Sequence, residues 1–137
     1  MLYEPGERPK DLSAAAALLR DAAEGGDFLL VAEAGGRMIG YISAQRGRMH
    51  RIVHSAYIVA GILRDHRGQG IGAEFFKRLD AWAEEKKITR LELTVICENE
   101  AVKRLYLKSG FQIEGVKRNS VCVDSRYLDE YYMAKIR

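Results

Sequence analysis

A glycine-rich junction at residues 67–72, with the sequence Arg-Gly-Gln-Gly-Ile-Gly, limits the fold of this chain more than any other feature. An apolar run typical of a strand precedes it, and a run with apolar residues at helical spacing follows it. Glycines let a turn expose successive backbone N–H groups, and the start of the following helix adds the positive end of its dipole. The junction therefore predicts a strand, a tight turn and a helix that together can hold a pyrophosphate.

A glycine-rich turn between a strand and a helix also occurs for purely steric reasons, so the junction alone leaves its role open. A second motif begins 27 residues after Gly72 and reads Asn99-x-Ala101 and then Leu105-Tyr106-x-x-Ser109-Gly110-Phe111. In content and in order, the two motifs resemble those of the GNAT superfamily of acetyl-CoA-dependent N-acyltransferases. They differ from a dinucleotide-binding fingerprint, which has three glycines in another spacing and a ribose-binding carboxylate about 20 residues further on.

The resemblance covers most of the chain, and it implies one acyltransferase domain over residues 1–137, with acetyl-CoA as co-substrate and no metal. It implies an α+β fold, in which a mixed, mostly antiparallel sheet has splayed central strands and flanking helices. The implied reaction is acetyl transfer to a primary amine by direct attack in a ternary complex. Amino acids, polyamines and protein N-termini all stay open as acceptors, and a non-catalytic domain that binds or senses acyl-CoA is the alternative.

Composition and charge limit the size and the partners of the protein. With 137 residues, of which 47% are hydrophobic, the chain is long enough for one packed domain and too short for two ordinary ones. A net charge of +3 without a long block of one sign does not favour nucleic acid, whereas it suits a polyanionic cofactor.

The cysteines and the lengths of the apolar runs indicate the cellular compartment of the protein. Cys97 and Cys122 lack the spacing of a zinc site, and we expect both to be reduced, half-buried strand residues. The N-terminus has no leader-like pattern, and no run approaches the ~18 apolar residues of a membrane span. These features predict a cytoplasmic protein.

Hydrophobic periodicity and turn residues predict three helices and six strands. The helices are expected at residues 12–24, 71–86 and 100–109, and the strands at 28–33, 38–45, 52–63, 90–96, 111–123 and 127–136. The turn residues at 34–37 and 124–126 predict that the first two strands, and likewise the last two, pair as antiparallel hairpins. Phe75, Leu79 and Trp82 recur at helical spacing, and we expect them to lie in the core rather than to bind a cofactor. The basic residues 46–51 are expected to form a solvated loop.

Acyl transfer from a thioester to an amine needs a neutral amine, a polarised carbonyl and a hydrogen bond or proton for the departing thiolate. The resemblance assigns the last role to Tyr106. Asn99 matches a family residue that supports the pantetheine arm, although an N-cap fits asparagine equally well. The resemblance assigns the carbonyl and pantetheine to the backbone of Ala60, Gly61 and Ile62, and the pyrophosphate to Arg67 and the backbone of Gly68, Gln69, Gly70, Ile71, Gly72 and Ala73.

The sequence leaves the general base unassigned. Many relatives carry glutamate at the position of Thr94, whereas this chain has its glutamate two residues earlier, at Glu92, on the same face of the strand. Glu92 is the candidate base, directly or through water, and a water chain alone is an alternative. His54 is a weaker candidate, because a lone strand histidine is more often structural. Residues 127–133 mix acids and aromatics, as amine-binding surfaces do, but they also alternate like an ordinary strand.

The N-terminal region departs from the GNAT pattern. Family members open with a strand and one or two helices, whereas only helix 12–24 is predicted before residue 28. Residues 1–9 resemble an inter-helix loop of longer relatives, so we expect the first strand and first helix to be missing. Because that region lines one wall of the acceptor cleft and covers a sheet edge, a second copy of the chain could complete the site. A fully active, monodisperse monomer in light scattering would reject this dimer hypothesis.

Overall fold

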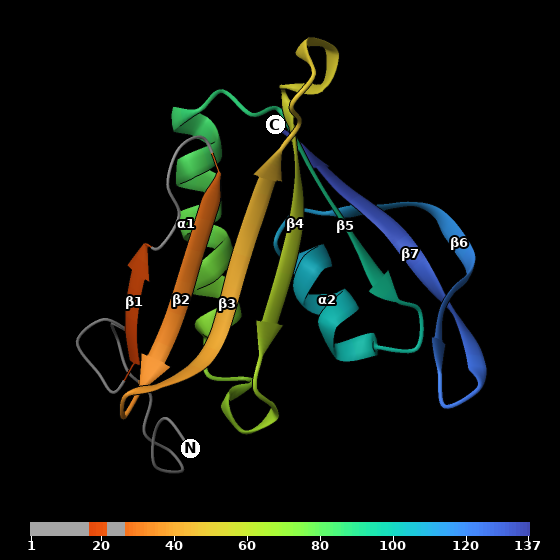
Figure 1. Ribbon diagram of the computed structural model, residues 1–137, viewed down its shortest axis with the longest axis horizontal. Helices are drawn as coiled ribbons and strands as arrows, with labels where there is room; N and C mark the ends of the chain where they lie inside the picture. Colours follow the sequence, from red (N-terminus) through yellow and green to blue (C-terminus); the bar gives the residue numbers. More distant parts are fainter. Residues whose placement is uncertain (1–16, 22–26) are drawn as a thin grey trace.

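The computed structural model describes residues 17–21 and 27–137, which form a seven-stranded mixed sheet and two α-helices (Figure 1). The strands are β1 (Ala17–Asp21), β2 (Phe28–Ala34), β3 (Arg37–Arg46), β4 (Ser55–Ile62), β5 (Arg90–Ile96), β6 (Gln112–Val123) and β7 (Arg126–Ile136). The helices are α1 (Ile71–Glu85), α2 (Glu100–Lys108) and the short 3-10 turns η1 (His50–Ile52) and η2 (Arg64–His66).

The order of the strands across the sheet is β1-β2-β3-β4-β5-β7-β6. Among the described strands, β4 and β5 form the one parallel pair, and every other pair is antiparallel. The predicted α+β class with a mostly antiparallel sheet is therefore confirmed. The predicted hairpins are also confirmed, because β2 and β3 join at Gly35 and Gly36, and β6 and β7 join at Asp124 and Ser125, all with positive φ.

The prediction of a helix at residues 12–24 is wrong where the structure describes that region. Residues 17–21 form β1, which pairs antiparallel with β2 from Ala17 opposite Ala34 to Asp21 opposite Leu30. The prediction that no strand precedes the hairpin is wrong for the same reason. Alanine, leucine and arginine favour helices, but the edge of β2 offers a row of unpaired backbone groups that this segment satisfies. The rest of the predicted helix, and the predicted loop at residues 1–9, lie outside the described residues.

The predicted strand at residues 52–63 is shorter than expected at its start. Residues 50–52 form η1, and the Ser55 hydroxyl donates to the Ile52 carbonyl at 3.0 Å, which closes the turn before β4. The expectation for the cysteines is also only partly right. Cys97 is half-buried but follows the end of β5, and Cys122 lies on β6 and is exposed; both are free thiols.

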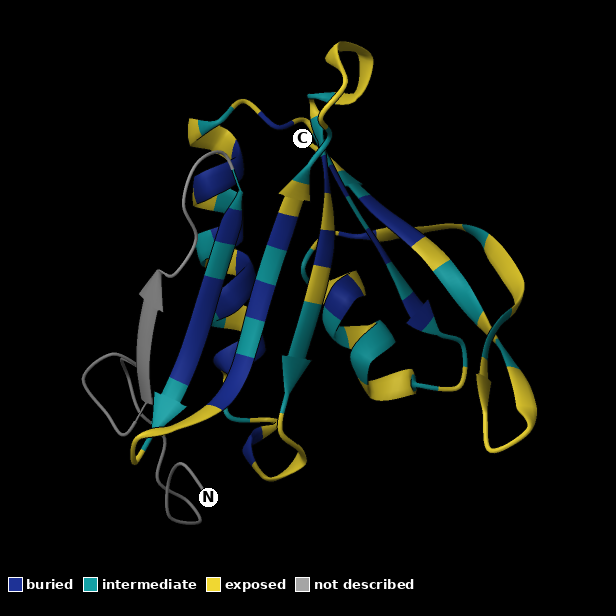
Figure 2. Cartoon of the chain, viewed as in Figure 1, coloured by how far each residue is buried: buried dark blue, intermediate teal, exposed yellow. Residues whose placement is uncertain are grey.

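The core lies between the sheet and the helices (Figure 2). Phe75, Leu79 and Trp82 of α1 are all buried, as their spacing predicted, and the Trp82 ring lies 5.5 Å from the ring of Phe28 on β2. In α1 the apolar residues recur every three or four positions, so one face of the helix covers the sheet. Among the described helices, none is long and apolar enough to cross a membrane.

The central strands β4 and β5 pair only at their first residues and then diverge. β4 pairs with β5 only at Ser55–Arg90, Ala56–Leu91 and Tyr57–Glu92. Beyond Tyr57, β4 keeps its hydrogen bonds to β3 but has no partner in β5, and Figure 1 shows the two strands diverging with α2 behind the opening. The predicted splay is thus confirmed. It leaves one backbone edge of residues 58–62 free to bind an extended group.

Alternation defines a second face of the sheet at this opening. Leu91, Leu93 and Val95 of β5 are buried toward the helices, whereas Glu92 and Thr94 alternate with them and lie on the opposite side of the sheet. We call this side the front face. Strand pairing places five side chains on it close to the opening, from β3, β4, β5 and β7: Tyr41, Tyr57, Glu92, Thr94 and Tyr132.

Candidate functional site

The glycine-rich junction connects the free end of β4 to α1. Gly68 and Gly70 have φ of +75° and +87°, which favours glycine, and a Cβ added to either would meet no atom within 4 Å. Gly70 begins α1 without a side-chain cap, and the first helical bond runs from the Glu74 N–H to the Gly70 carbonyl. The N–H groups of the first helical turn have no partner within the helix and lie next to the open space over these two glycines, which suits an anion.

Gly72 has a different role from the two glycines before it. It is buried, and a Cβ at this position would lie 2.8 Å from Cδ2 of Leu105 on α2. The glycine lets α1 and α2 approach closely at the start of α1. The two sequence motifs are thus in direct contact, although 27 residues separate Gly72 from Asn99.

Three side chains surround the junction. The Arg67 Nε donates to the Ile62 carbonyl at 3.2 Å, which holds the guanidinium beside the free end of β4. The Gln69 Oε1 and the His66 Nδ1 are buried without a hydrogen-bond partner among the described residues. Burial lowers the pKa of His66, so it is neutral at pH 7. Sequence reasoning missed His66, and a histidine directly before the motif gave no periodic signal that it would be buried.

Tyr106 lies in an aromatic cluster on the helix side of the opening. Its ring centroid is 5.5 Å from that of Phe76 on α1 and 6.0 Å from that of Phe111. Burial raises the pKa of Tyr106 to about 12, and the nearby Tyr57 and Tyr41 add to the rise. The hydroxyl therefore keeps its proton at neutral pH and can donate a hydrogen bond.

Tyr57 and Tyr41 line the opening on the front face, and sequence reasoning did not single out either. The Tyr57 hydroxyl is hydrogen-bonded to Thr94 Oγ1 at 3.0 Å, and Thr94 lies two residues beyond Glu92, the last residue of β5 that pairs with β4. The Tyr41 ring covers Gly61, where an added Cβ would lie 3.1 Å from Cε1 of the ring. Their alternation along β3 and β4 was readable in the sequence, but their convergence depends on the strand register.

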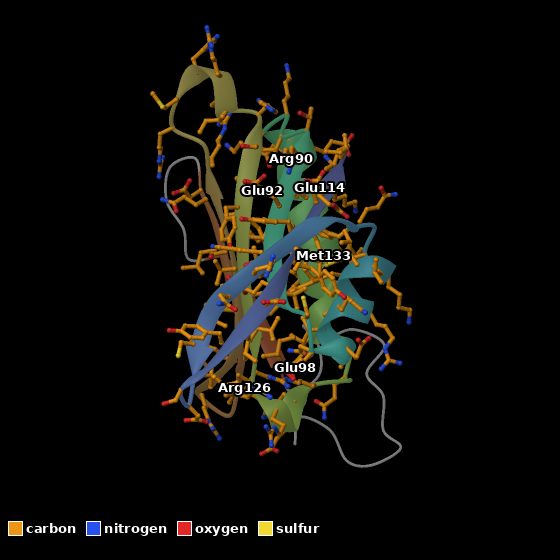
Figure 3. All side chains as sticks on the ribbon, turned by 90° about the vertical axis from the view of Figure 1, so that its right-hand side faces the viewer. Arg90, Glu92, Glu98, Glu114, Arg126 and Met133 are labelled. Atoms are coloured by element: carbon orange, nitrogen blue, oxygen red, sulfur yellow. The ribbon has the colours of Figure 1, made fainter. Side chains whose placement is uncertain are left out.

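Glu92 lies beside Tyr57, where the strands part, and it is ion-paired. The Arg90 Nε donates to Glu92 at 2.8 Å, and the two Nη groups of Arg90 donate to Glu114 of β6 at 3.1 and 2.6 Å. Figure 3 shows these three side chains together at one end of the sheet. Arg90 lowers the pKa of Glu114, and the two carboxylates raise the pKa of Arg90.

Two other predicted site residues, His54 and Asn99, lie in a turn and at the start of a helix. His54 is exposed in the turn before β4 rather than on the strand, and its carbonyl accepts from the N–H groups of Thr89 and Arg90. The Asn99 Oδ1 accepts from the Val102 N–H at 3.3 Å and so caps α2. Among residues 17–21 and 27–137, no group of three or more metal-ligating side chains comes together.

Comparison with known proteins decides the family. The model of the acetyltransferase (GNAT) family matches residues 2–111 of this chain. The chain is also 31% identical to the L-amino acid N-acetyltransferase AaaT of Escherichia coli K12 over 114 residues, which are 79% of this chain and 67% of that protein.

The chain belongs to the GNAT acetyltransferase family.

Solved structures agree with this assignment. A GNAT-family acetyltransferase from Streptococcus pneumoniae matches this GNAT chain with a TM-score of 0.77 and 27% identity, over 82% of this chain and 68% of the other. The Salmonella typhimurium protein yncA, solved with its cofactor acetyl-CoA, matches with a TM-score of 0.73 over 81% of this chain and 65% of its own. At 23% identity, that second match supports the fold alone.

The geometry of this GNAT acetyltransferase fits acetyl-CoA, the co-substrate of the family. The free edge of β4 at residues 58–62 can pair with an extended amide-containing arm. The open space over Gly68 and Gly70, next to the first turn of α1, can take a pyrophosphate. Arg67 adds a cation at the point where the two parts meet.

Proposed function

We propose that this chain acetylates a primary amine in the cytoplasm, by direct attack of the amine on acetyl-CoA in a ternary complex within one domain of residues 1–137. The observation that carries the proposal is the position of Tyr106, a buried and protonated hydroxyl behind the opening between β4 and β5. Tyr57 and Glu92 lie at the same opening.

The cofactor is held mainly by backbone groups. Ala60, Gly61 and Ile62 bind the pantetheine arm along the free edge of β4, and Asn99 supports that arm in addition to capping α2. The pyrophosphate is bound by Arg67 and by the backbone of Gly68, Gln69, Gly70, Ile71, Gly72 and Ala73. Acetyl-CoA supplies an activated acetyl group, to which the amine nitrogen forms a new bond as the carbon–sulfur bond breaks.

Tyr106 donates a hydrogen bond to the sulfur as negative charge develops on it. A thiol has a pKa near ~8.5, so full proton transfer from a phenol with a pKa of about 12 is uphill by roughly 3.5 pH units. The hydroxyl therefore stabilises the thiolate without giving up its proton. Such a contact lowers the barrier because it strengthens only as charge appears.

Glu92 removes the proton that the amine loses, directly or through water. Its carboxylate is about two-fifths exposed and uses one oxygen for the Arg90 Nε, so its remaining acceptor positions can face an ammonium group. The register places Glu92 next to Tyr57, at the position where the strands part.

The first experiment is a thermal shift with saturating acetyl-CoA against equimolar ATP, followed by CoA release with a panel of amines. A ligand at ~100 times its dissociation constant stabilises a protein by about 2.7 kcal/mol, so acetyl-CoA should raise the melting temperature and ATP should not. Selective stabilisation without turnover of any amine would favour a domain that binds acyl-CoA without catalysis.

Tyr106→Phe tests the catalytic assignment. We expect kcat to fall by at least about tenfold, with little change in the KM for acetyl-CoA, because the lost hydrogen bond matters most in the transition state. Tyr127→Phe removes the hydroxyl of an exposed tyrosine at the start of β7 and serves as the control. Equal turnover of both variants would exclude Tyr106 from the chemistry.

A further inference from the structure

Resting on the function proposed above, we propose that the acceptor is a diamine or polyamine, a cationic amine that carries no carboxylate. The observation behind this inference is the group of Arg90, Glu92 and Glu114 at the point where β4 and β5 part (Figure 3). We call these three residues the apex cluster. With one cation and two carboxylates, the cluster carries a net negative charge beside the reacting end of the opening.

Arg90 has little capacity left to bind a carboxylate of a substrate. A guanidinium recognises a carboxylate best through two parallel N–H groups. Glu114 occupies the pair formed by the two Nη groups, at 3.1 and 2.6 Å, and Glu92 occupies the Nε edge at 2.8 Å. An amino acid that entered here would have to displace one of these glutamates, because both edges are taken.

The two glutamates, in contrast, retain capacity to bind cations. An ionised carboxylate offers about four lone-pair positions. Arg90 uses one hydrogen bond to Glu92 and two to Glu114, and the side chains of the two glutamates are 39% and 42% exposed. Glu92 can therefore receive the reacting nitrogen, and Glu114 can receive a second ammonium group further out.

Aromatic rings extend this surface on the front face. Tyr57 and Tyr132 are 42% and 45% exposed, and both flank Thr94, one by its hydrogen bond and the other by register on β7. An ammonium group is attracted to the exposed face of an aromatic ring. Two rings next to an excess of carboxylate favour a cation and offer an anion no compensating contact.

Hydrogen bonding and register define the positions of two cations on the neighbouring strands, Arg46 and Lys117. The Arg46 Nε, at the end of β3, donates to the Val53 carbonyl at 3.0 Å. Lys117 of β6 lies opposite Glu130, and Glu130 lies opposite Ile96. Ile96 is six residues along β5 from Arg90, which corresponds to about 20 Å, whereas Lys117 is three residues along β6 from Glu114, which corresponds to about 10 Å.

The inference is tested with cadaverine and L-lysine as acceptors, since lysine is cadaverine with an added carboxylate. The complete chain is assayed with saturating acetyl-CoA, and CoA release is measured. We expect kcat/KM to be at least about tenfold higher for cadaverine, because the carboxylate of lysine meets the like charge of the apex cluster. Equal values, or a preference for lysine, would overturn the inference and leave the proposed function intact. No CoA release with any amine would overturn both.

Glu114→Gln tests the role of the cluster with nearly unchanged side-chain shape. The substitution removes one negative charge and frees the Nη groups of Arg90, so the preference for cadaverine over lysine should fall by at least about fivefold. The KM for acetyl-CoA should stay within about twofold, because Glu114 lies away from the cofactor residues.

Glu98→Gln is the matched control for that variant. It removes the carboxylate from another arginine pair, in which Arg126 Nη2 donates to Glu98 at 2.7 and 3.1 Å, at the opposite end of the sheet (Figure 3). We expect it to leave the acceptor preference unchanged. A Glu114→Gln protein with the melting temperature and the acceptor preference of the control would contradict the inference. If Glu114→Gln does not fold, the comparison of cadaverine with lysine on the unaltered chain still tests the inference.

Discussion

At the scale of single residues, the surroundings of Tyr106 raise the pKa of its hydroxyl above the ordinary value for tyrosine. The ring contacts Phe76 and Phe111, and the nearest polar influences on its ionisation are Tyr57 and Tyr41. All but Phe111 lie 30 or more positions away along the chain. The sequence could therefore indicate which tyrosine to consider, whereas its raised pKa follows from contacts that exist only in the folded chain.

The raised pKa of Tyr106 predicts a loss of stability at high pH. Below pH 10 the hydroxyl is protonated in both the folded and the unfolded states, so its stabilising contribution is complete. Between pH 10 and about 12 the unfolded phenol ionises while the folded one stays protonated, so the free energy of unfolding falls, by about 3 kcal/mol in total. Urea denaturation of the wild type and Tyr106→Phe at pH 9 and pH 11.5 measures the difference. A difference between the two proteins that does not change with pH would contradict this prediction.

At the scale of elements, the glycines of the junction show that one residue type serves two purposes. Gly68 and Gly70 permit a left-handed backbone and leave space above it, whereas Gly72 permits α1 to contact Leu105 on α2. The sequence predicted the first purpose from the spacing of the glycines. It could not predict the second, because nothing in the spacing indicates which helix packs on Gly72.

Gly72→Ala should therefore have an effect that depends on Leu105. In the wild type, the new methyl group would lie 2.8 Å from Leu105 Cδ2, and overpacking of about 1–3 kcal/mol should exceed the ~1 kcal/mol that alanine gains over glycine in a helix. In a Leu105→Ala background the space exists, so the same substitution should raise the free energy of unfolding. Chemical denaturation of the four proteins measures both effects, and the same sign in both backgrounds would count against close packing at this position.

The N-terminal strand is the element that sequence reasoning predicted wrongly. Residues 17–21 have the composition of a helix, and in isolation that is the better interpretation. Propensities differ by less than about 1 kcal/mol per residue, and five paired positions along β2 outweigh them. The other predicted elements are all present, although β4 begins three residues later than predicted, because their hydrophobic period, their turn residues and their tertiary pairing agree.

At the scale of the whole molecule, a few contacts join segments that are distant in the sequence. Lys135 on β7 donates to Asp80 on α1 at 2.8 Å, and Arg137 approaches the same carboxylate at 3.7 Å. This contact fixes the last strand against the helix that begins at the junction. It connects the two sides of the splayed sheet, since α1 packs on β2 and β3 and β7 lies beyond β5.

Asp80→Asn should weaken that connection. The Asp80 and Lys135 side chains are both more than half buried, so loss of the charge should lower the free energy of unfolding by about 1–2 kcal/mol, with a smaller loss in high salt. Glu85→Gln, at an exposed position of the same helix, is the control and should change stability by less than about 0.5 kcal/mol. Equal stability of the two variants in urea denaturation would show that the contact contributes nothing measurable.

The local features of this protein can be predicted from its sequence. The glycine-rich junction, the Asn99 motif, the amphipathic α1 and the two hairpins all follow from residue types at short spacing, because turns, caps and helix faces are set by neighbours along the chain. These features were also sufficient to indicate the family and its cofactor.

The side chains that meet at the opening between β4 and β5 depend on how the strands pair in the folded chain. Strand register brings Tyr57 beside Glu92 and Thr94, and a bulge after Ile113 accompanies the contact of Glu114 with Arg90. A shift of one residue in either pairing would move these side chains to the other face. The charge near a bound substrate comes from side chains on several strands. Those side chains are brought together only when the strands pair.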